Sequence, residues 1–238
     1  MLQKAKAIFL SKKQLTHNVY EFTFLCKDPK TIEYFPGQYV ILNVPDKNGN
    51  IKRLYSVFNF ENKKDEFKIA VKIIPNGKGS SYLMALKEQE NVDFEGPTGV
   101  FLLNKNNKDK IFLATGTGIM PILSLIFSNI KDVEKFTLFW GLRQKSDIFY
   151  FDLLQQIAKN NNNFTFGIFI SREEIKNEPY LYSGHIDIGL EKLFIEKKSD
   201  IENTEFYICG NKMNVDSVRN YLIKKGIKTE NIKTEKFG

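Results

Sequence analysis

Short apolar and aromatic runs, separated by turn residues, dominate the first hundred residues of the chain. Strands are expected in four segments: Val19–Leu25, Tyr39–Val44, Arg53–Phe60 and Phe67–Ile74. Asp46–Asn50 is expected to form a tight hairpin turn, and a short helix should begin near Ser80-Ser81 and carry Tyr82–Leu86. Short strands joined by tight turns favour an antiparallel barrel or sandwich.

The rhythm changes after the polar segment Phe101–Lys110, which is expected to connect two domains. Apolar strands then alternate with helical runs: strand Ile111–Ala114, helix Ile122–Asn129, strand Phe136–Trp140, helix Phe149–Lys159, strand Phe164–Ile170, strand Phe206–Cys209 and helix Val215–Lys225. This alternation predicts right-handed βαβ units and a parallel sheet. The predicted fold class is therefore two domains, an antiparallel β-barrel in residues 1–103 and a parallel α/β domain in residues 104–238.

The net charge of +7 adds a preference for acidic partners. Residues 1–105 carry 16 Lys and Arg against 11 Asp and Glu, and the remainder carries 19 against 17. The excess in the first half suits an acidic protein or phosphate groups, although a general richness in Lys and Asn explains it equally well. No stripe of basic and aromatic residues indicates nucleic-acid binding.

Cysteine and histidine are too few and too scattered for metal chemistry. Cys26 and Cys209 have no neighbouring cysteine, and both histidines are isolated, so neither an iron–sulfur cluster nor a zinc site is expected. Redox chemistry would have to come from an organic cofactor. No apolar run reaches membrane-spanning length and the N-terminus lacks a secretory signal, so we expect a cytoplasmic protein.

Two glycine turns fall at strand ends in the second domain. Thr115–Pro121 (T-G-T-G-I-M-P) lies between a strand and a helix, and Cys209–Met213 (C-G-N-K-M) lies at a second such junction. Glycine lets the backbone approach a ligand, and a helix N-terminus favours anionic groups. Because the carboxyl ends of parallel strands meet in one crevice, the two turns predict a shared ligand site. The alternative is a pair of tight turns without a ligand.

The first domain carries two further segments, Arg53–Ser56 (R-L-Y-S) and Gly77–Leu83 (G-K-G-S-S-Y-L). Arg can bind a phosphate through two parallel hydrogen bonds, and Tyr can stack on a flat ring. Ser80 and the amides at a helix start form a second anion site. Each segment alone is compatible with an ordinary strand or turn, but together they indicate a ligand with a pyrophosphate and a planar ring.

The order of these motifs resembles that of the ferredoxin–NADP+ reductase superfamily, and the similarity covers nearly the whole chain. The matching segments are Phe35–Val40 (F-P-G-Q-Y-V), R-L-Y-S, G-K-G-S-S, Gly96–Gly99 (G-P-T-G), T-G-T-G-I-x-P and C-G-N-x-M. The resemblance implies an N-terminal six-stranded barrel that holds FAD and a C-terminal α/β domain that holds NADP(H).

The resemblance also implies roles for individual residues. FAD contacts are expected at Arg53, Leu54, Tyr55, Ser56, Val71, Lys72, Gly79, Ser80 and Ser81. Nucleotide contacts are expected at Thr115, Gly116, Thr117, Gly118, Arg143, Ser171, Arg172, Cys209, Gly210 and Met213. Roles in the reaction itself are expected for Ser56, Cys209, Glu235 and Phe237.

Glu235–Gly238 resembles the terminal Glu-x-aromatic element of the family. In that element the Glu assists proton and electron traffic, and the ring, here Phe237, covers the flavin until nicotinamide displaces it. A frayed tail with an incidental Phe is the alternative.

The choice of nucleotide depends on charged residues near strand ends. Ser171-Arg172 matches the family element for the 2′-phosphate of NADP+, and a guanidinium suits that dianion. Where the family often has a second Arg, this chain has His185, and Arg143 could compensate for it. NADP(H) is therefore expected in preference to NAD(H).

Together these inferences predict an FAD-dependent oxidoreductase, expected to be a monomer, that transfers electrons between NADP(H) and an acidic one-electron carrier, ferredoxin or flavodoxin. The alternatives are an NAD(P)H-dependent flavin reductase, the reductase component of an oxygenase system and a non-catalytic nucleotide-binding subunit.

Overall fold

A computed structural model describes residues 2–47, 49–59, 63–131, 135–196 and 201–237 of the chain. It divides into two compact units: the first comprises Met1–Leu103 with Leu123–Phe127, and the second comprises Asn104–Ile122 with Ser128–Gly238. Asn48 of the predicted turn, Phe60 of the predicted strand and Gly238 of the terminal element lie outside the described residues.

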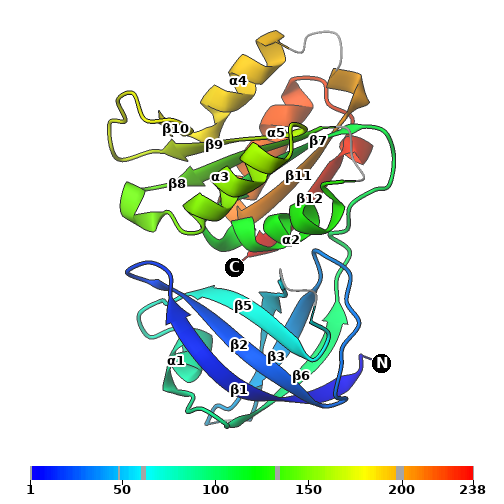
Figure 1. The fold of residues 1–238 in the computed structure, drawn as a ribbon, viewed down its shortest axis with the longest axis vertical. Helices are drawn as coiled ribbons and strands as arrows, with labels where there is room; N and C mark the ends of the chain where they lie inside the picture. The colour runs from blue at the N-terminus through cyan, green and yellow to red at the C-terminus, as the bar shows by residue number, and fades with distance from the viewer. Residues whose placement is uncertain (1, 48, 60–62, 132–134, 197–200, 238) are drawn as a thin grey trace. The chain divides into compact units, whose positions relative to one another are not determined.

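The first unit is built on a six-stranded antiparallel sheet (Figure 1). Its elements are β1 (Lys4–Gln14), β2 (Val19–Asp28), β3 (Tyr39–Val44), β4 (Ile51–Ser56), β5 (Glu66–Lys72), α1 (Lys78–Ala85) and β6 (Asn91–Thr98), with strand order β4-β3-β6-β1-β2-β5. The edge strands meet where Phe58, just after β4, exchanges backbone hydrogen bonds with Lys68 of β5 at 3.0 and 3.2 Å. The predicted six-stranded antiparallel architecture is confirmed.

Strands β1 and β6 are the two strands of this sheet that residue type did not reveal. In β1 the buried residues Ala5, Ala7 and Phe9 alternate with residues that are exposed or only partly buried, and in β6 Val92 and Phe94 alternate in the same way. This period of two places one face of each strand in the core of the unit. Alanine has little intrinsic preference for strands, so alternation, and not composition, was the signal available.

Several predicted boundaries in this unit were wrong, and two of them have a clear structural reason. Strand β4 ends at Ser56 and not at Phe60, because the chain then crosses to β5 through Phe58. Helix α1 begins at Lys78, with Gly77 as its N-cap, so Ser80 lies inside the first turn. The predicted hairpin turn is present, with reciprocal backbone hydrogen bonds between Asp46 and Gly49 at 3.1 and 3.2 Å.

The second unit is a six-stranded parallel sheet in the order β10-β9-β8-β7-β11-β12. Its elements are β7 (Asp109–Thr115), α2 (Ile119–Asn129), β8 (Phe136–Leu142), α3 (Phe151–Asn160), β9 (Phe164–Ile170), β10 (Leu181–Ser183), α4 (Ile186–Glu196), β11 (Thr204–Asn211), α5 (Lys212–Lys224) and β12 (Ile232–Phe237). The parallel α/β prediction is thereby confirmed.

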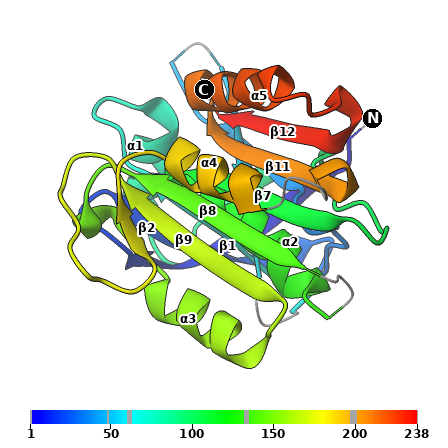
Figure 2. The same cartoon turned by 90° about the horizontal axis from the view of Figure 1, so that it is seen from above.

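Helices cover both faces of this parallel sheet (Figure 2). On one face, Leu190 of α4 and Leu222 of α5 pack into a core with Leu113 and Ile208 of the sheet. On the other face, Phe151 of α3 contacts Phe166 edge-on, with ring centroids 6.2 Å apart. Among the described helices, none is both long enough and apolar enough to cross a membrane.

The second unit also shifts several predicted boundaries. Helix α2 begins at Ile119, three residues before the prediction, because Pro121 is tolerated in a first turn, where its missing N–H has no partner to lose. Helix α3 begins at Phe151, after Tyr150 in a left-handed conformation. Elements β10, α4 and β12 were not predicted, and β12 shows that the terminal segment is a paired strand.

Buried polar side chains fix the amino ends of β7 and β11. Lys110 Nζ lies 3.1 Å from Glu205 Oε2, and the carboxylate also accepts hydrogen bonds from Tyr207 (3.0 Å) and from the Asn104 and Asn106 amides (2.9 Å each). Burial favours the neutral acid, but hydrogen bonds from Asn104, Asn106 and Lys110 outweigh it and lower the pKa of Glu205. Part of the predicted connection between the domains is therefore fastened to the second sheet.

Candidate functional site

Two predicted motifs of the first unit meet where α1 packs on β4. A β-carbon added at Gly79 would lie 2.5 Å from the Tyr55 hydroxyl and 3.0 Å from Cγ of Arg53. A β-carbon would clash with the Tyr55 hydroxyl and crowd Arg53, so glycine allows α1 to approach the face of β4 that carries these two residues. The R-L-Y-S and G-K-G-S-S segments therefore form one cluster.

The chemistry of this cluster combines a neutral ring with an exposed cation. Burial raises the pKa of Tyr55 to about 12, although Arg53 nearby opposes the rise, so the phenol stays neutral at physiological pH. The Arg53 side chain is exposed and donates to the carbonyl of Lys52 at 2.9 Å, which leaves further guanidinium donors for an anion. Lys78 at the start of α1 pairs with Asp46 at 2.5 Å and ties the helix to the β3–β4 turn.

The two serines of G-K-G-S-S differ in what they contact. The Ser80 hydroxyl is buried and lies within hydrogen-bonding distance of the Ile74 carbonyl (3.2 Å), the Gly77 carbonyl (3.1 Å) and the Ile74 amide (3.3 Å). It therefore shapes the turn before α1. Ser81 is exposed, so of the two hydroxyls it is the one that is accessible to a ligand.

The other FAD contacts expected in this unit lie on β4 and β5. Leu54 alternates with Arg53 and Tyr55, so its exposed side chain points to the opposite face of β4, and Ser56 is buried at the end of the strand. Val71 is buried and Lys72 exposed at the end of β5, directly before the turn that Ser80 shapes. A neutral aromatic ring, an exposed guanidinium and a glycine-lined helix start are groups that fit FAD.

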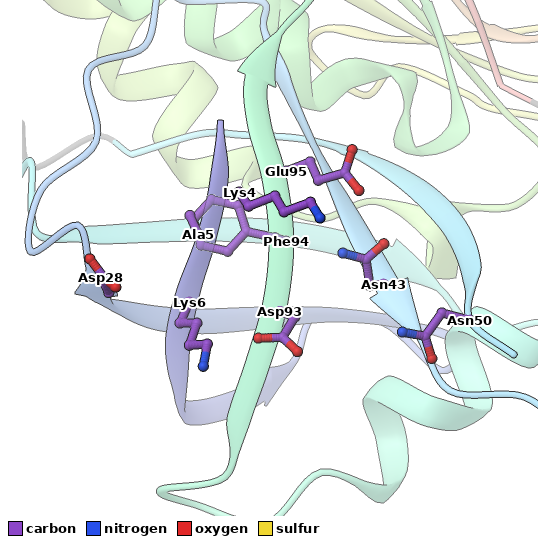
Figure 3. Close-up of a pocket in the computed structure, with 9 residues that line it drawn as sticks. All are labelled: Lys4, Ala5, Lys6, Asp28, Asn43, Asn50, Asp93, Phe94 and Glu95. Atoms are coloured by element: carbon purple, nitrogen blue, oxygen red, sulfur yellow. The ribbon is translucent and has the colours of Figure 1, made fainter. Parts of the chain in front are cut away.

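A separate hollow of about 520 Å³ lies over β1, β3 and β6 of the first unit (Figure 3). Its lining residues are Lys4, Ala5, Lys6, Asp28, Asn43, Asn50, Asp93, Phe94 and Glu95. Lys6 stands opposite Asp28 on β2 and Asp93 on β6 in the strand register. The lining therefore alternates in charge from strand to strand, and it shares no described residue with the predicted cofactor contacts.

In the second unit the two glycine turns pack directly against each other. A β-carbon at Gly118 would lie 2.4 Å from the Cys209 carbonyl oxygen, and one at Gly210 would lie 2.0 Å from Oγ1 of Thr115. The carboxyl ends of β7 and β11 are neighbours in the sheet, so the T-G-T-G and C-G-N segments share one edge, as their positions after strands predicted.

Thr115 and Cys209 differ in the chemistry that their side chains offer at this edge. Among the described residues, Oγ1 of Thr115 is the one buried side-chain nitrogen or oxygen without a hydrogen-bond partner. A lone hydroxyl beside a glycine loop fits a ligand that carries an amide or phosphate. The Cys209 thiol is 1% exposed, and burial, reinforced by Glu235 opposite it, raises its pKa well above normal. Cys209 is thus shaped for packing and not for nucleophilic attack.

The predicted phosphate ligands gather at the same edge, on β8 and β9. The Arg172 amide donates to the Arg143 carbonyl at 3.0 Å, and the Ser171 amide donates to the Leu142 carbonyl at 3.0 Å, so the parallel ladder continues beyond both strands. Gly184, which precedes His185, bonds to the Ile170 carbonyl at 2.8 Å. Three neighbouring strand ends therefore bring Arg143, Arg172 and His185 together.

The acidic residues around the two arginines have partners of their own. Glu178 pairs with Lys145 at 2.7 Å, Glu174 pairs with Lys176 at 3.2 Å, and Glu173 accepts from the Lys145 amide at 3.0 Å. Both arginine side chains are exposed, and neither has a hydrogen bond or ion pair to any residue that the structure describes. Two positive groups are thus available for an anion.

The structure also gives the positions of two further predicted site residues, Met213 and Phe237. Met213 lies in the first turn of α5 and is 83% exposed, and Phe237, the last residue of β12, stands opposite Asn211. Sequence reasoning missed Trp140, whose indole N–H donates to the Gly116 carbonyl at 2.9 Å. The available signal was a lone tryptophan at the end of a strand.

An aromatic–guanidinium cluster on an antiparallel sheet, followed by a glycine loop on a parallel one, is typical of two-domain redox enzymes that bind a flavin and a nicotinamide nucleotide. The chain belongs to the oxidoreductases that combine an FAD-binding domain with an NAD-binding domain. Residues 6–102 match the oxidoreductase FAD-binding domain, and residues 112–219 match the oxidoreductase NAD-binding domain.

Several known proteins share this arrangement. One component of the Na+-translocating NADH-quinone reductase of Actinobacillus pleuropneumoniae is 28% identical over 235 residues, which cover 89% of this chain and 58% of that protein. Its counterpart in Serratia proteamaculans is 30% identical over 203 residues, covering 80% and 50%. This chain thus spans about half the length of the curated relatives it matches. A Neisseria gonorrhoeae ferredoxin NADP+ reductase with bound FAD and NADP has the same fold, with TM-score 0.84, 22% identity and 99% of both chains covered.

Proposed function

We propose that this protein transfers electrons between NADP(H) and a one-electron carrier protein, ferredoxin or flavodoxin, with FAD as its cofactor. The observation that carries the proposal is the pair of adjacent arginines, Arg143 and Arg172, whose side chains have no partner among the described residues, at the strand edge that also bears the Thr115 loop. The 2′-phosphate is the group that distinguishes NADP(H) from NAD(H), and two guanidinium groups match its charge. Bound FAD would supply the conversion between hydride transfer and single-electron transfer.

In this proposal the first unit holds FAD. Arg53 binds the pyrophosphate, the α1 amides and Ser81 complete its site, and the neutral Tyr55 ring packs on the isoalloxazine. The exposed guanidinium and the close approach of Gly79 to Tyr55 support these assignments. Ser56, at the end of β4, is assigned a place near the reactive nitrogen of the flavin.

The second unit holds the nicotinamide nucleotide. The unsatisfied Thr115 hydroxyl is assigned to a polar group of the nicotinamide half, and Arg143, Ser171 and Arg172 to the 2′-phosphate. Cys209 contributes shape, and Glu235 opposite it is assigned to proton traffic. The Phe237 ring is assigned the role of covering the flavin until nicotinamide displaces it.

The carrier is proposed to be acidic, because the positive excess of the chain lies mainly in residues 1–105. A second candidate function is that of an NADH-dependent reductase component within a larger system. Two observations favour it: the curated relatives are named as subunits of an NADH-quinone reductase, and His185 stands where the family often has a second Arg.

Anaerobic reduction of the purified, FAD-loaded protein tests the proposal. NADPH should bleach the flavin absorbance at lower concentration and faster than NADH, and the reduced protein should then reduce a ferredoxin or flavodoxin. Faster reduction by NADH, with no electron transfer to either carrier, would favour the second candidate. Failure to bind FAD or to react with either nucleotide would contradict both.

A further inference from the structure

The single tryptophan of the chain reaches from β8 to the loop that follows β7. Trp140 is fully buried, and its indole N–H donates to the Gly116 carbonyl at 2.9 Å. Its ring packs edge-on against Phe149, with centroids 5.0 Å apart and an interplanar angle of 82°. The strand pairing beneath is regular, with Trp140 opposite Ala114 and Gly141 opposite Thr115. The indole is thus a rigid donor aimed at the glycine loop.

The conformation of Gly116 is one that favours glycine. Gly116 has φ +54°, and a β-carbon there would lie in open space, with no neighbour within 4 Å. The Ile119 amide also bonds to the Gly116 carbonyl, which closes the single 3-10 turn of Gly116–Gly118. Trp140 adds a constraint from outside the loop, and because it comes from the sheet it fixes the turn relative to the strand ends.

We infer that Trp140 is a positioning residue for the nicotinamide nucleotide, acting through the Gly116 carbonyl. In a planar trans peptide the carbonyl of Gly116 and the N–H of Thr117 point in opposite directions. With the carbonyl held on the indole, the Thr117 N–H faces away from Trp140 and is offered to a ligand. Without that donor the Gly116 carbonyl is still held by the Ile119 amide within the turn, but it loses its bond to the sheet, and glycine allows the peptide to change its orientation. The inference rests on the proposed function, in that this loop is the nucleotide site.

Two matched variants separate the hydrogen bond from the packing. Trp140→Phe keeps an aromatic ring against Phe149 but lacks the N–H, and Phe149→Leu keeps the N–H but loses the ring contact. Loss of one positioning hydrogen bond should raise the Kd for NADP+, measured by calorimetry on the FAD-loaded protein, and the KM for NADPH by about three- to ten-fold, with kcat nearly unchanged. Phe149→Leu should lower the melting temperature and leave both constants as in the wild type.

Unchanged nucleotide binding in Trp140→Phe would overturn the inference, and so would an equal loss of binding in Phe149→Leu, since packing would then explain the effect. The wild-type protein supplies a test that does not depend on a variant folding. It has one tryptophan and so one indole N–H resonance, which NADP+ should shift and 2′,5′-ADP, which lacks the nicotinamide half, should leave in place. An unshifted resonance at saturating NADP+ contradicts the role of Trp140, whereas no NADP+ binding by calorimetry contradicts the proposed function instead.

Discussion

Arg143 and Arg172 are neighbours because a backbone hydrogen bond joins the segments that follow β8 and β9. Their spacing is therefore set by the sheet and not by their flexible side chains. Glu174 and Glu178 lie close in sequence, but each pairs with a lysine, and the Glu173 carboxylate accepts from the Lys145 amide. Both guanidinium groups are therefore available to a ligand even though the segment contains three acids.

Arg172→Ala should raise the KM for NADPH by about ten-fold or more and leave the KM for NADH within about two-fold. A charge-assisted hydrogen bond contributes on the order of 1.5–3 kcal/mol, and the lost bond involves only the 2′-phosphate. Steady-state kinetics with both nucleotides would measure the effect. Arg172→Lys keeps the charge but not the planar guanidinium fork. Its KM for NADPH should therefore lie between those of the wild type and of Arg172→Ala. Equal changes for both nucleotides would show that Arg172 does not select the phosphate.

The turn from β5 into α1 combines a structural serine, Ser80, with an accessible one, Ser81. Ser80→Ala removes the buried hydroxyl that bonds to Ile74 and Gly77, so it should lower stability by about 1 kcal/mol with little change in the Kd for FAD. Ser81→Ala should leave the melting temperature unchanged and weaken FAD binding by about ten-fold. Thermal melts and FAD titration of the apoprotein measure both. If only Ser80→Ala weakened FAD binding, the assignment of Ser81 to the pyrophosphate would be wrong.

Sequence patterns predicted elements well where composition and periodicity agreed. The aromatic runs of β2 and β5 and the apolar runs of β7, β8 and β9 were found within a few residues of their observed bounds. Strand β1 was missed because its buried face uses alanine, and β12 was missed because only Ile232 in it is buried. Helix α4 follows a glycine turn without a marked cap, and its exposed Ile188 and Ile195 blur its apolar stripe.

The candidate site was predictable to the extent that it follows backbone rules. Glycine turns after parallel strands had to share one edge, and the structure brings Gly118 against Cys209 accordingly. The hydrogen-bond partners of individual side chains were not predictable. Nothing in the letters G-K-G-S-S tells that Ser80 bonds to its own turn, and nothing in L-F-W-G tells that Trp140 reaches Gly116, because both depend on tertiary packing.

One buried ion pair joins β7 to β11 in the second sheet, and its carboxylate also accepts hydrogen bonds from Asn104 and Asn106 of the connecting segment. Lys110 is 0% exposed and Glu205 4%, and removing one partner leaves an uncompensated charge in the interior. Glu205→Gln should therefore destabilise the protein by about 3 kcal/mol in urea denaturation at neutral pH. Glu33→Gln, at the exposed pair with Lys64, is the matched control and should have little effect.

The free energy of unfolding of the wild type and of Glu205→Gln, measured over a range of pH, tests whether the buried charges cause this loss of stability. Because the pKa of Glu205 is lowered from 4.5, its contribution is complete above pH 4.5 and is lost as the pH falls through the folded value. The pKa of Lys110 is lowered by burial from 10.5, so the deficit of Glu205→Gln should shrink as the pH rises toward 10.5 and the amine becomes neutral. A deficit independent of pH in the alkaline range would mean that the cost does not come from the buried charge.

The depth of the two cysteines bears on how the protein can be labelled. Cys26 is 5% exposed, and its pKa is raised to about 11 by burial and by the carboxylate of Asp65, while Cys209 is buried more deeply still. Maleimides and iodoacetamide react with thiolates, so they should leave the native fold unmodified. A cysteine placed at an exposed position such as Ser217 would then be the sole reactive thiol. Site-specific dyes and spin labels could be attached without first removing either natural cysteine.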